Sequence, residues 1–463
     1  MRDRSLSEAE QNKNLLNEID GHVSMQAGQD LSAWELMRTI CEDIGPHPAG
    51  SPAMAQARDY FRTRLAALGF VSLTDEEVAV RLWNPGVSEL ELLEPVKKKY
   101  DCLQHLFTAA ADLNLPLVDV GDGTADDLRR AGSRVRGSAL LMSGRGITGA
   151  KFIPEIVRIM QACKSGAKAI IFRNAGPIDL PALQVPDFSG NIDIPVPCLA
   201  VSESAGSELA EATSRETGRI SVKTNGSSEP GICANLVADM GPDELPAECI
   251  ILSAHLDSFW NAPGAFDNLT GVATVYEIGR LLSPFRKHFR RRLRVIAFTA
   301  EELGFQGSKA YVARHAEELD DVRLVVNLDS LFPATARGMA VMWSPVMRDY
   351  INNAFTGARQ LVDVRNLYCC SSDYLPFMLE GVPACRPADW EDSFPAGSHT
   401  HADDLANVRP DWIQLNAIVY AHLLARLLTD PNPLPARKLS PDEVSEQVRK
   451  NDAVEGVGWM GFN

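Results

Sequence analysis

The sequence lacks an uninterrupted apolar run of the roughly 18–20 residues that a membrane-spanning helix needs. Its first residues, MRDRSLSE, do not resemble the apolar core of a secretion signal. None of the nine cysteines forms a C-x-x-C pair, which argues against a disulfide framework and a structural zinc finger. We therefore expect a cytoplasmic protein with no membrane role.

An excess of positive charge is also missing. The chain has 45 Lys and Arg against 61 Asp and Glu, a net charge of −16. This sign repels nucleic-acid phosphates and anionic lipid, so we expect no nucleic-acid partner, whereas an acidic protein suits a cation site. Hydrophobic residues make up 45% of the chain and charged residues 23%, a composition typical of a soluble globular protein.

The chain has 463 residues, more than the roughly 250–300 at which a single core stops growing. Strand-like and helix-like runs alternate from Asn235 onward, which predicts an α/β fold with a mostly parallel mixed sheet between helices. A stretch rich in Pro, Gly and short β-like runs interrupts the chain before it. We expect a polar, loosely docked lead-in at 1–30 and a main domain in two segments, 31–89 and 229–435. An inserted β-rich α/β domain at 90–228 separates these segments, and a polar tail follows at 436–463.

Acidic and histidine residues follow three of the predicted strands. The strand at 249–254 runs into His255 and Asp257, the strand at 293–299 into Glu301 and Glu302, and the strand at 323–328 into Asp329. Ligand sites in parallel sheets lie beyond the carboxyl ends of the strands. The shared position predicts a single site, although a salt bridge remains an alternative for Asp329.

Two further segments supply candidates. Small residues in the loop 263–271 allow the backbone to fold back and aim Asp267 at the strand ends, with a helix cap as the alternative. The side chains of adjacent residues Glu301 and Glu302 are expected to point in different directions. One glutamate could then bind a metal ion while the other faces a water molecule as general base. A solvated surface pair is the alternative.

Histidines close to the site remain ambiguous at this stage. In the loop 398–404 either His399 or His401 can complete a cation site, and Asp403 is expected to brace the imidazole. His47, which lies between two prolines in an early turn, is expected to be a surface or capping histidine rather than a ligand.

Together the candidates offer two imidazoles and three carboxylates, from His255, Asp267, Glu302, Asp329 and His399. This nitrogen and oxygen set suits Zn²⁺ or another first-row divalent ion. Two ions about 3.5–4 Å apart, sharing one carboxylate, would use all five ligands and leave positions open for substrate. The arrangement is typical of metal-dependent hydrolysis.

These residues resemble the co-catalytic zinc peptidases, the family of bacterial leucyl aminopeptidase, aminopeptidase Y and plasma glutamate carboxypeptidase. The matching motifs stand in the family's order: Gly45-Pro46 with Gly50-Ser51-Pro52, His255-x-Asp257, Pro263-Gly264-Ala265-x-Asp267-Asn268, Glu301-Glu302-x-Gly304-x-x-Gly307-Ser308, Asn327-Leu328-Asp329, Ser372-Asp373 with Phe377 and Gly381-Val382-Pro383-Ala384, and His399-Thr400-x-x-Asp403.

The resemblance implies roles for individual residues. His255 and Asp329 would hold one zinc, Glu302 and His399 the other, and Asp267 would bridge them, with Glu301 as general base and Asp257 orienting His255. The spacing of four residues before Asp403 selects His399 as the ligand and leaves His401 as a substrate contact. The insert is similar to the protease-associated domain that several members carry.

Three positions depart from the family pattern: Tyr374, Ser398 and Asp404 stand where members have His, Tyr and Thr. The implied function is an exopeptidase of aminopeptidase or dipeptidase type that acts on a peptide or small amide, with a homodimer as a candidate assembly. The alternatives are an amidohydrolase or carboxypeptidase for N-acylated amino acids, a non-catalytic receptor-like relative and a glutaminyl-cyclase-like transferase.

Overall fold

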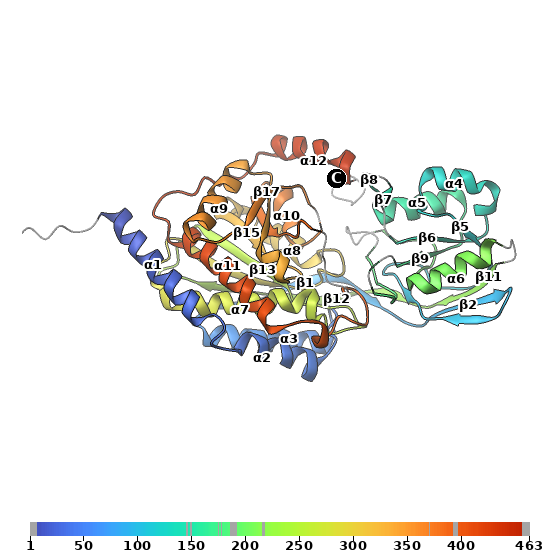
Figure 1. The fold of residues 1–463 in the computed structure, drawn as a ribbon, viewed down its shortest axis with the longest axis horizontal. Helices are drawn as coiled ribbons and strands as arrows, with labels where there is room; N and C mark the ends of the chain where they lie inside the picture. Colours follow the sequence, from blue (N-terminus) through green and yellow to red (C-terminus); the bar gives the residue numbers. More distant parts are fainter. Residues whose placement is uncertain are drawn as a thin grey trace, which may run out of the picture.

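The computed structural model describes residues 7–144, 147–148, 151–174, 176, 178–185, 192–214, 218–369, 371–391 and 397–455. They form two bodies joined by a long two-stranded ribbon (Figure 1). The core body comprises residues 7–84 and 227–455, and the inserted body the residues between them. The expected domain boundaries, at 90 and 228, fall within strands β2 and β12.

An eight-stranded mixed sheet forms the centre of the core body. Its strands, in spatial order, are β1 (Ser72–Asn84), β12 (Ser227–Met240), β14 (Arg292–Phe298), β13 (Cys249–His255), β15 (Val322–Asn327), β18 (Ala384–Pro387), β16 (Gly338–Met342) and β17 (Asp363–Asn366). Neighbours from β14 through β18 are parallel. The fold class predicted from the sequence is therefore confirmed.

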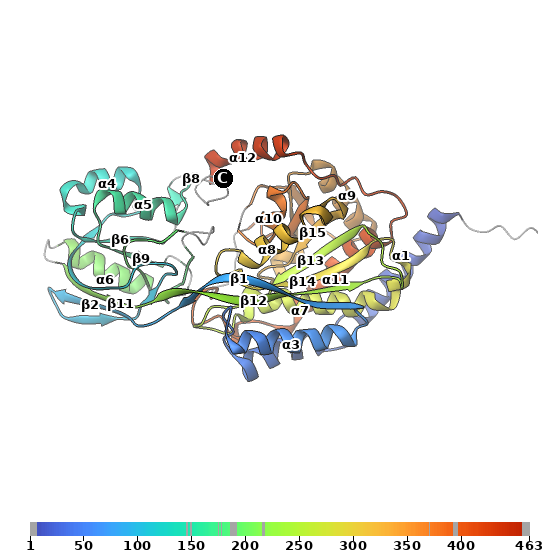
Figure 2. The ribbon, with the colours of Figure 1, turned by 180° about the vertical axis from the view of Figure 1, so that it is seen from behind.

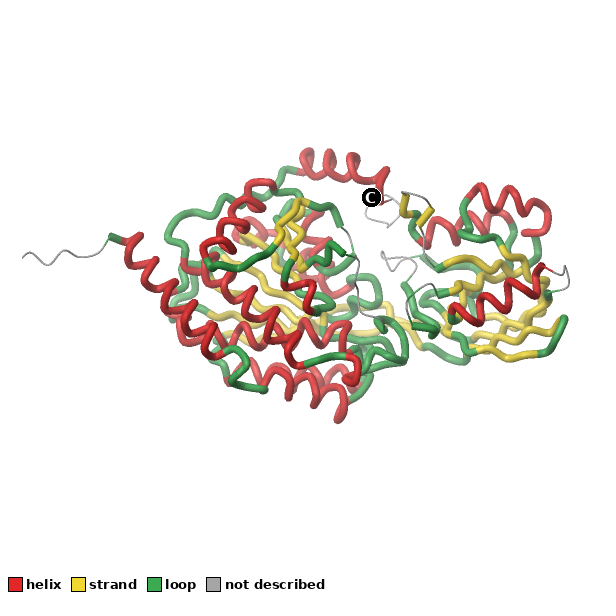
Figure 3. Tube along the Cα trace, in the orientation of Figure 1, coloured by secondary structure: helices red, strands yellow, loops and turns green. Residues whose placement is uncertain are grey.

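Helices cover both faces of this sheet (Figures 1 and 3). One face packs against α1 (Glu8–Gln26), α2 (Ser32–Thr39), α3 (Pro52–Ala67), α7 (Thr270–Leu282), α9 (Pro345–Gly357) and α11 (Pro410–Thr429). The other face packs against α8 (Gln306–Arg314) and α10 (Tyr374–Leu379). All seven residues of β13 are buried, because helices cover both faces of the strand. Ile250 and Leu252 pack on one face of the sheet, and Ile251 packs on the other.

The inserted body contains a second eight-stranded sheet. Its strands are β3 (Lys98–Tyr100), β2 (Ser88–Glu94), β11 (Arg219–Thr224), β5 (Ala111–Asp119), β6 (Ala139–Ser143), β9 (Ala169–Arg173), β10 (Cys198–Val201) and β4 (Leu103–Gln104). Helices α4 (Ala125–Ala131), α5 (Glu155–Ser165) and α6 (Glu203–Ser214) pack against it. Strand β6, helix α5 and strand β9 form a β-α-β unit with the two strands parallel.

The connecting ribbon consists of β1 and β12, which pair antiparallel from Ser72↔Asp239 to Asn84↔Ser227. Figure 2 shows both strands running out of the core sheet toward the inserted body. The chain therefore leaves and re-enters the core body along a single hydrogen-bonded ladder.

The expectation of a loosely docked lead-in is wrong. Helix α1 occupies most of residues 1–30 and begins with a capping box in which Ser7 and Glu10 cap each other. Ile19 and Val23 have no exposed surface, and Asp20 binds Arg426 and His422 of α11. The narrow apolar stripe among many polar residues concealed this helix in the sequence.

The tail also contains structure that the sequence did not indicate. Helix α12 (Pro441–Glu455) follows the end of the core sheet and lies at the top of Figure 1. Residues 456–463 of the predicted tail lie outside the described residues. Among the described residues no helix combines the length and apolar character needed to span a bilayer.

Candidate metal centre

The predicted site residues gather at the carboxyl edge of the core sheet. His255 ends β13, Glu301 and Glu302 follow β14, and Asp329 follows β15. Asp267 comes from the loop before α7, and His399 from the loop before α11. Five separate chain segments thus converge on one edge, as expected for a parallel sheet.

Asp267 lies between two imidazoles. Its Oδ1 atom is 3.1 Å from His255 Nε2, and its Oδ2 atom is 3.2 Å from His399 Nε2. Asp329 Oδ1 approaches His255 Nε2 at 3.6 Å, and Glu302 Oε2 approaches His399 Nε2 at 3.6 Å. The five side chains therefore form two ligand groups that share Asp267, the grouping that the family resemblance implies.

Burial and charge show that this cluster suits cations. The ligand atoms within each group lie within 4.8 Å of one another. Of the candidate ligands and the candidate base, four residues are less than a tenth exposed: His255, Asp267, Glu301 and Glu302. Burial first, and neighbouring carboxylates second, raise the pKa of Glu302 well above its usual range. Burial opposes protonation of His255, yet Glu301, Asp267 and Asp329 raise its pKa well above normal. Divalent ions would neutralise this concentration of buried negative charge.

The loop before α7 is shaped to present Asp267. Gly264 has φ of 65°, and a Cβ atom there would lie 2.5 Å from the main-chain oxygen of Asp267, so only glycine fits. The next residue, Asn268, donates to Leu328 O at 2.9 Å and accepts from Ser330 N at 3.1 Å. This amide ties the Asp267 loop to the end of β15 that carries Asp329.

Asp257 acts differently from the sequence expectation. His255 Nδ1 contacts the main-chain oxygen of Asp257 at 3.1 Å, whereas its carboxylate is 3.8 Å away. That carboxylate instead accepts the main-chain N–H groups of Glu301 at 3.1 Å and Glu302 at 3.3 Å. Asp257 therefore orients His255 through its backbone and positions both glutamates through its side chain.

Asp403 does not brace the His399 imidazole, and that expectation is wrong. Its carboxylate accepts the main-chain N–H groups of Phe266 at 2.6 Å and Asp267 at 3.2 Å. The His399 ring is instead held by the inserted body, where Leu183 O lies 3.0 Å from Nδ1. A main-chain carbonyl carries no sequence signal, so only the three-dimensional structure could reveal this partner.

His401 lies apart from both ligand groups. Its side chain is exposed, and its Nδ1 atom is 3.0 Å from the main-chain oxygen of Asn261. The other doubtful histidine, His47, is fully buried rather than on the surface, with Nδ1 2.8 Å from Gly45 O. Burial lowers its pKa to about 4, so the ring is neutral at pH 7. The main-chain N–H of His47 donates to the Ser258 hydroxyl at 3.0 Å, which fixes the turn.

Hydroxyl groups orient two of the carboxylates. Ser398 Oγ donates to Asp267 Oδ2 at 2.7 Å, and Ser372 Oγ donates to Asp329 Oδ2 at 2.6 Å. Ser372 is itself held by the Asn327 amide at 2.9 Å. The sequence did not predict that these serines orient carboxylates. Ser372 lies in a motif that matches the family, which could have pointed to its role, whereas Ser398 differs from the family pattern.

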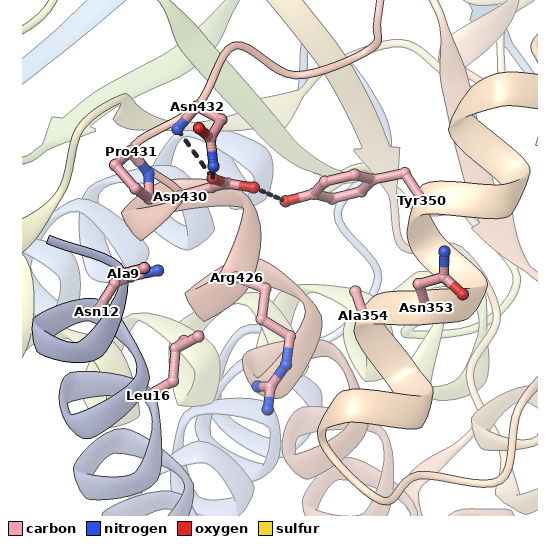
Figure 4. Close-up of a pocket in the computed structure, with 10 residues that line it drawn as sticks. All are labelled: Ala9, Asn12, Leu16, Tyr350, Asn353, Ala354, Arg426, Asp430, Pro431 and Asn432. Carbon is pink, nitrogen blue, oxygen red and sulfur yellow. Dashed lines mark hydrogen bonds between the residues drawn. The ribbon is translucent and has the colours of Figure 1, made fainter. Parts of the chain in front are cut away.

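A separate pocket of about 340 Å³ lies between α1, α9 and α11 (Figure 4). Three of its polar side chains bind one another: Tyr350 donates to Asp430 at 2.8 Å, and Asn432 donates to the other oxygen of the same carboxylate at 3.0 Å. It contains no histidine, so it offers no second candidate for the chemistry described above.

A buried cluster of imidazoles and carboxylates at the carboxyl edge of a mixed sheet defines a metal-dependent hydrolase. Residues 235–424, which supply all seven predicted site residues, match Peptidase family M28. This segment of the core body is thus similar to the M28 peptidases, a family of metallopeptidases.

Curated relatives extend beyond this segment. Carboxypeptidase Q of Homo sapiens is 23% identical over 404 residues, covering 84% of each chain. Aminopeptidase YwaD of Bacillus subtilis is 26% identical over 286 residues, covering 60% of this chain and 58% of the relative. Both the carboxypeptidase and the aminopeptidase branches of the family are therefore represented among its relatives.

Solved structures share the architecture. A peptidase M28 precursor from Shewanella amazonensis superposes with a TM-score of 0.79 at 21% identity, over 93% of this chain and 100% of the other. BSAP, a zinc aminopeptidase from Bacillus subtilis, superposes with a TM-score of 0.67 at 20% identity, over 88% and 97%. The likeness includes the inserted body, because the matched regions cover most of this chain.

Proposed function

We propose that this chain is a zinc-dependent exopeptidase with two metal sites. The observation that supports it is Asp267, which lies between the His255–Asp329 pair and the His399–Glu302 pair within hydrogen-bonding distance of both imidazoles. When bound, zinc supplies a Lewis acid that polarises the scissile carbonyl and lowers the pKa of water. Other first-row divalent ions fit the same donors.

Glu301 is the proposed general base. Its carboxylate lies in the group with His255 and Glu302, while its main chain is fixed by Asp257. Burial, together with the charges of Asp329, Asp373 and Asp267, raises the pKa of Glu301 well above its usual range. A carboxylate of raised basicity takes a proton from the attacking water and returns it to the leaving amine.

The substrate is proposed to be a peptide or small amide cleaved next to a chain end. Aminopeptidase or dipeptidase action suits the aminopeptidase relatives, and a carboxypeptidase or amidohydrolase action is the alternative, supported by the likeness to carboxypeptidase Q. Ser398 replaces the tyrosine of some family members and binds Asp267, so oxyanion stabilisation by that position is not part of the proposal. A cytoplasmic location and a homodimer also remain proposals.

Metal analysis combined with a substrate panel tests the function. The purified chain should retain zinc, lose activity on chelation and regain it when zinc returns. Free dipeptides, aminoacyl amides and N-blocked peptides should separate the exopeptidase classes. Full activity of a metal-free preparation, or hydrolysis of none of these substrates by the zinc-loaded chain, would contradict the proposal.

A further inference from the structure

His105 of the inserted body is a buried histidine that the proposed mechanism does not use. Its ring packs against Phe172 of β9, with 5.3 Å between the ring centroids. Its main-chain N–H donates to Cys198 O on β10 at 2.9 Å, and its main-chain oxygen accepts the Thr108 hydroxyl at 2.8 Å. These contacts fix His105 to the second sheet and leave the two ring nitrogens for other partners.

The Nδ1 atom of His105 accepts a hydrogen bond from the main chain of Gln184. The Gln184 N–H donates to it at 3.2 Å, and the Leu106 N–H donates to Gln184 O at 3.3 Å. An acceptor at Nδ1 requires that the neutral ring carry its proton on Nε2, and Nε2 lies 3.4 Å from Glu155 Oε1 at the start of α5. Both main-chain groups of Gln184 are thus bound by residues 105 and 106.

The preceding residue, Leu183, makes the corresponding pair of contacts with His399. The Leu183 N–H donates to His399 O at 2.9 Å, and Leu183 O lies 3.0 Å from His399 Nδ1. Successive residues therefore bind different partners, as in a strand between two neighbours. Leu183 has no exposed surface and belongs to one apolar cluster with Leu106 of the inserted body and Leu303 of the core body.

We propose that His105 is a positioning residue for the metal ligand His399 and acts through residues 183 and 184. This inference rests on the proposed function, because it assumes that His399 Nε2 binds zinc. Loss of the acceptor at His105 Nδ1 releases the Gln184 N–H, so that Leu183 O holds the His399 ring less firmly, and supports of this kind govern metal affinity. The inserted body thereby contributes to zinc binding without supplying a ligand.

The test removes the Nδ1 acceptor in two ways and restores it in a third. His105→Phe keeps a ring but has no acceptor, His105→Gln carries its side-chain oxygen one bond further out, and His105→Asn places that oxygen close to the position of Nδ1. Leu128→Ala on α4 is the matched control, because Leu128 packs in the apolar core of the inserted body with Val118 and Val135. Zinc titration, thermal unfolding and hydrogen exchange of residues 178–185 are measured for every variant.

The wild type and Leu128→Ala should bind two zinc ions with the same affinities, although Leu128→Ala unfolds at a lower temperature. His105→Phe and His105→Gln should weaken one of the two binding steps about 10-fold, the lower end for a group that supports a ligand, and should speed hydrogen exchange of residues 178–185. His105→Asn should restore most of the loss. If His105→Phe does not fold, the comparison of His105→Asn with His105→Gln decides.

The same substitution in a chain that lacks the ligand isolates the contact. In the His399→Ala background, His105→Phe should cause no further loss of zinc affinity, because residues that act through one contact are not additive. A further loss there would overturn the proposal. Equal weakening of both binding steps by His105→Phe, the same loss in Leu128→Ala, or a loss that His105→Asn does not restore would also overturn it.

Failure of this inference is distinguishable from failure of the proposed function. In the first case the wild type binds two zinc ions, His399→Ala removes one binding step, and His105→Phe leaves both steps unchanged. In the second case the wild type binds no zinc, or His399→Ala leaves every binding step in place.

Discussion

The Nδ1 atom of His399 lies 3.0 Å from the main-chain oxygen of Leu183, so a candidate metal ligand of the core body is oriented by the inserted body. The contact is reciprocal, because the Leu183 N–H donates to the His399 oxygen at 2.9 Å. A carbonyl acceptor keeps the proton on Nδ1 and leaves the Nε2 lone pair for a metal ion.

Replacement of Leu183 by proline should weaken zinc binding at the His399 site. Proline has no N–H, so the reciprocal contact is lost, and supports of this kind change metal affinity by about 10- to 100-fold. Zinc titration of the purified variant measures the effect. Leu183→Ala, which keeps both backbone groups, is the control; an equal loss of affinity in that variant would assign the effect to side-chain packing.

Glu301→Gln should retain zinc and lose nearly all turnover. The amide keeps the shape of the side chain but cannot accept a proton, a loss worth about 10²- to 10⁴-fold in kcat. Metal analysis and kcat are measured on the same sample, with the exposed Glu391→Gln as control. Substantial turnover by a zinc-replete variant would remove Glu301 as the base.

His399→Ala and His401→Ala should differ in zinc content and in activity. The first removes a donor from the group with Asp267 and Glu302, and should lower zinc content and activity together. The second removes an exposed ring bound to Asn261, and should keep the metal and alter at most KM or kcat. Loss of zinc in His401→Ala alone would reverse the assignment.

Asp20→Asn should destabilise the protein at neutral pH. Burial would raise the pKa of Asp20, but Arg426 and His422 lower it to about 2. Since the pKa is about 3.9 in an unfolded chain, the carboxylate stabilises the fold above that pH and loses this effect as pH falls toward 2.

We expect a loss of about 1–3 kcal/mol in the free energy of unfolding at pH 7, shrinking below pH 4. Denaturant titrations at several pH values measure it, and Glu18→Gln on the same helix is the control. A difference between wild type and Asp20→Asn that does not depend on pH would show that the ion pair is not its source.

Buried strands could be read from the sequence. The strand predicted at 249–254 is β13, and the strand predicted at 323–328 corresponds to β15, one residue earlier. Such segments are apolar with a clear period, so local pattern and tertiary environment agree. Their positions also brought the seven candidate site residues to one edge, although their individual roles remain predictions.

Other features depend on contacts between distant segments. Helix α1 is stabilised by α11 through Asp20 and Arg426, and its own apolar stripe was too narrow to detect. Asp403 binds backbone groups of Phe266 and Asp267, which no residue pattern reveals. Hydrogen bonds between a side chain and a main-chain group cannot be predicted from the spacing of residue types, because every residue offers the same main-chain groups.

The inserted body is joined to the core body through the paired strands β1 and β12. Because Asn84 and Ser227 face each other at the end of the ladder, a tight hairpin turn could join them and close the core sheet without disturbing its register. A peptidase shortened in this way would leave the His399 ring without Leu183. It would also lose the packing of Leu106 and Phe107 against Ala300 and Leu303, which flank the two glutamates. The inserted body therefore supports the edge of the core sheet that carries the candidate site.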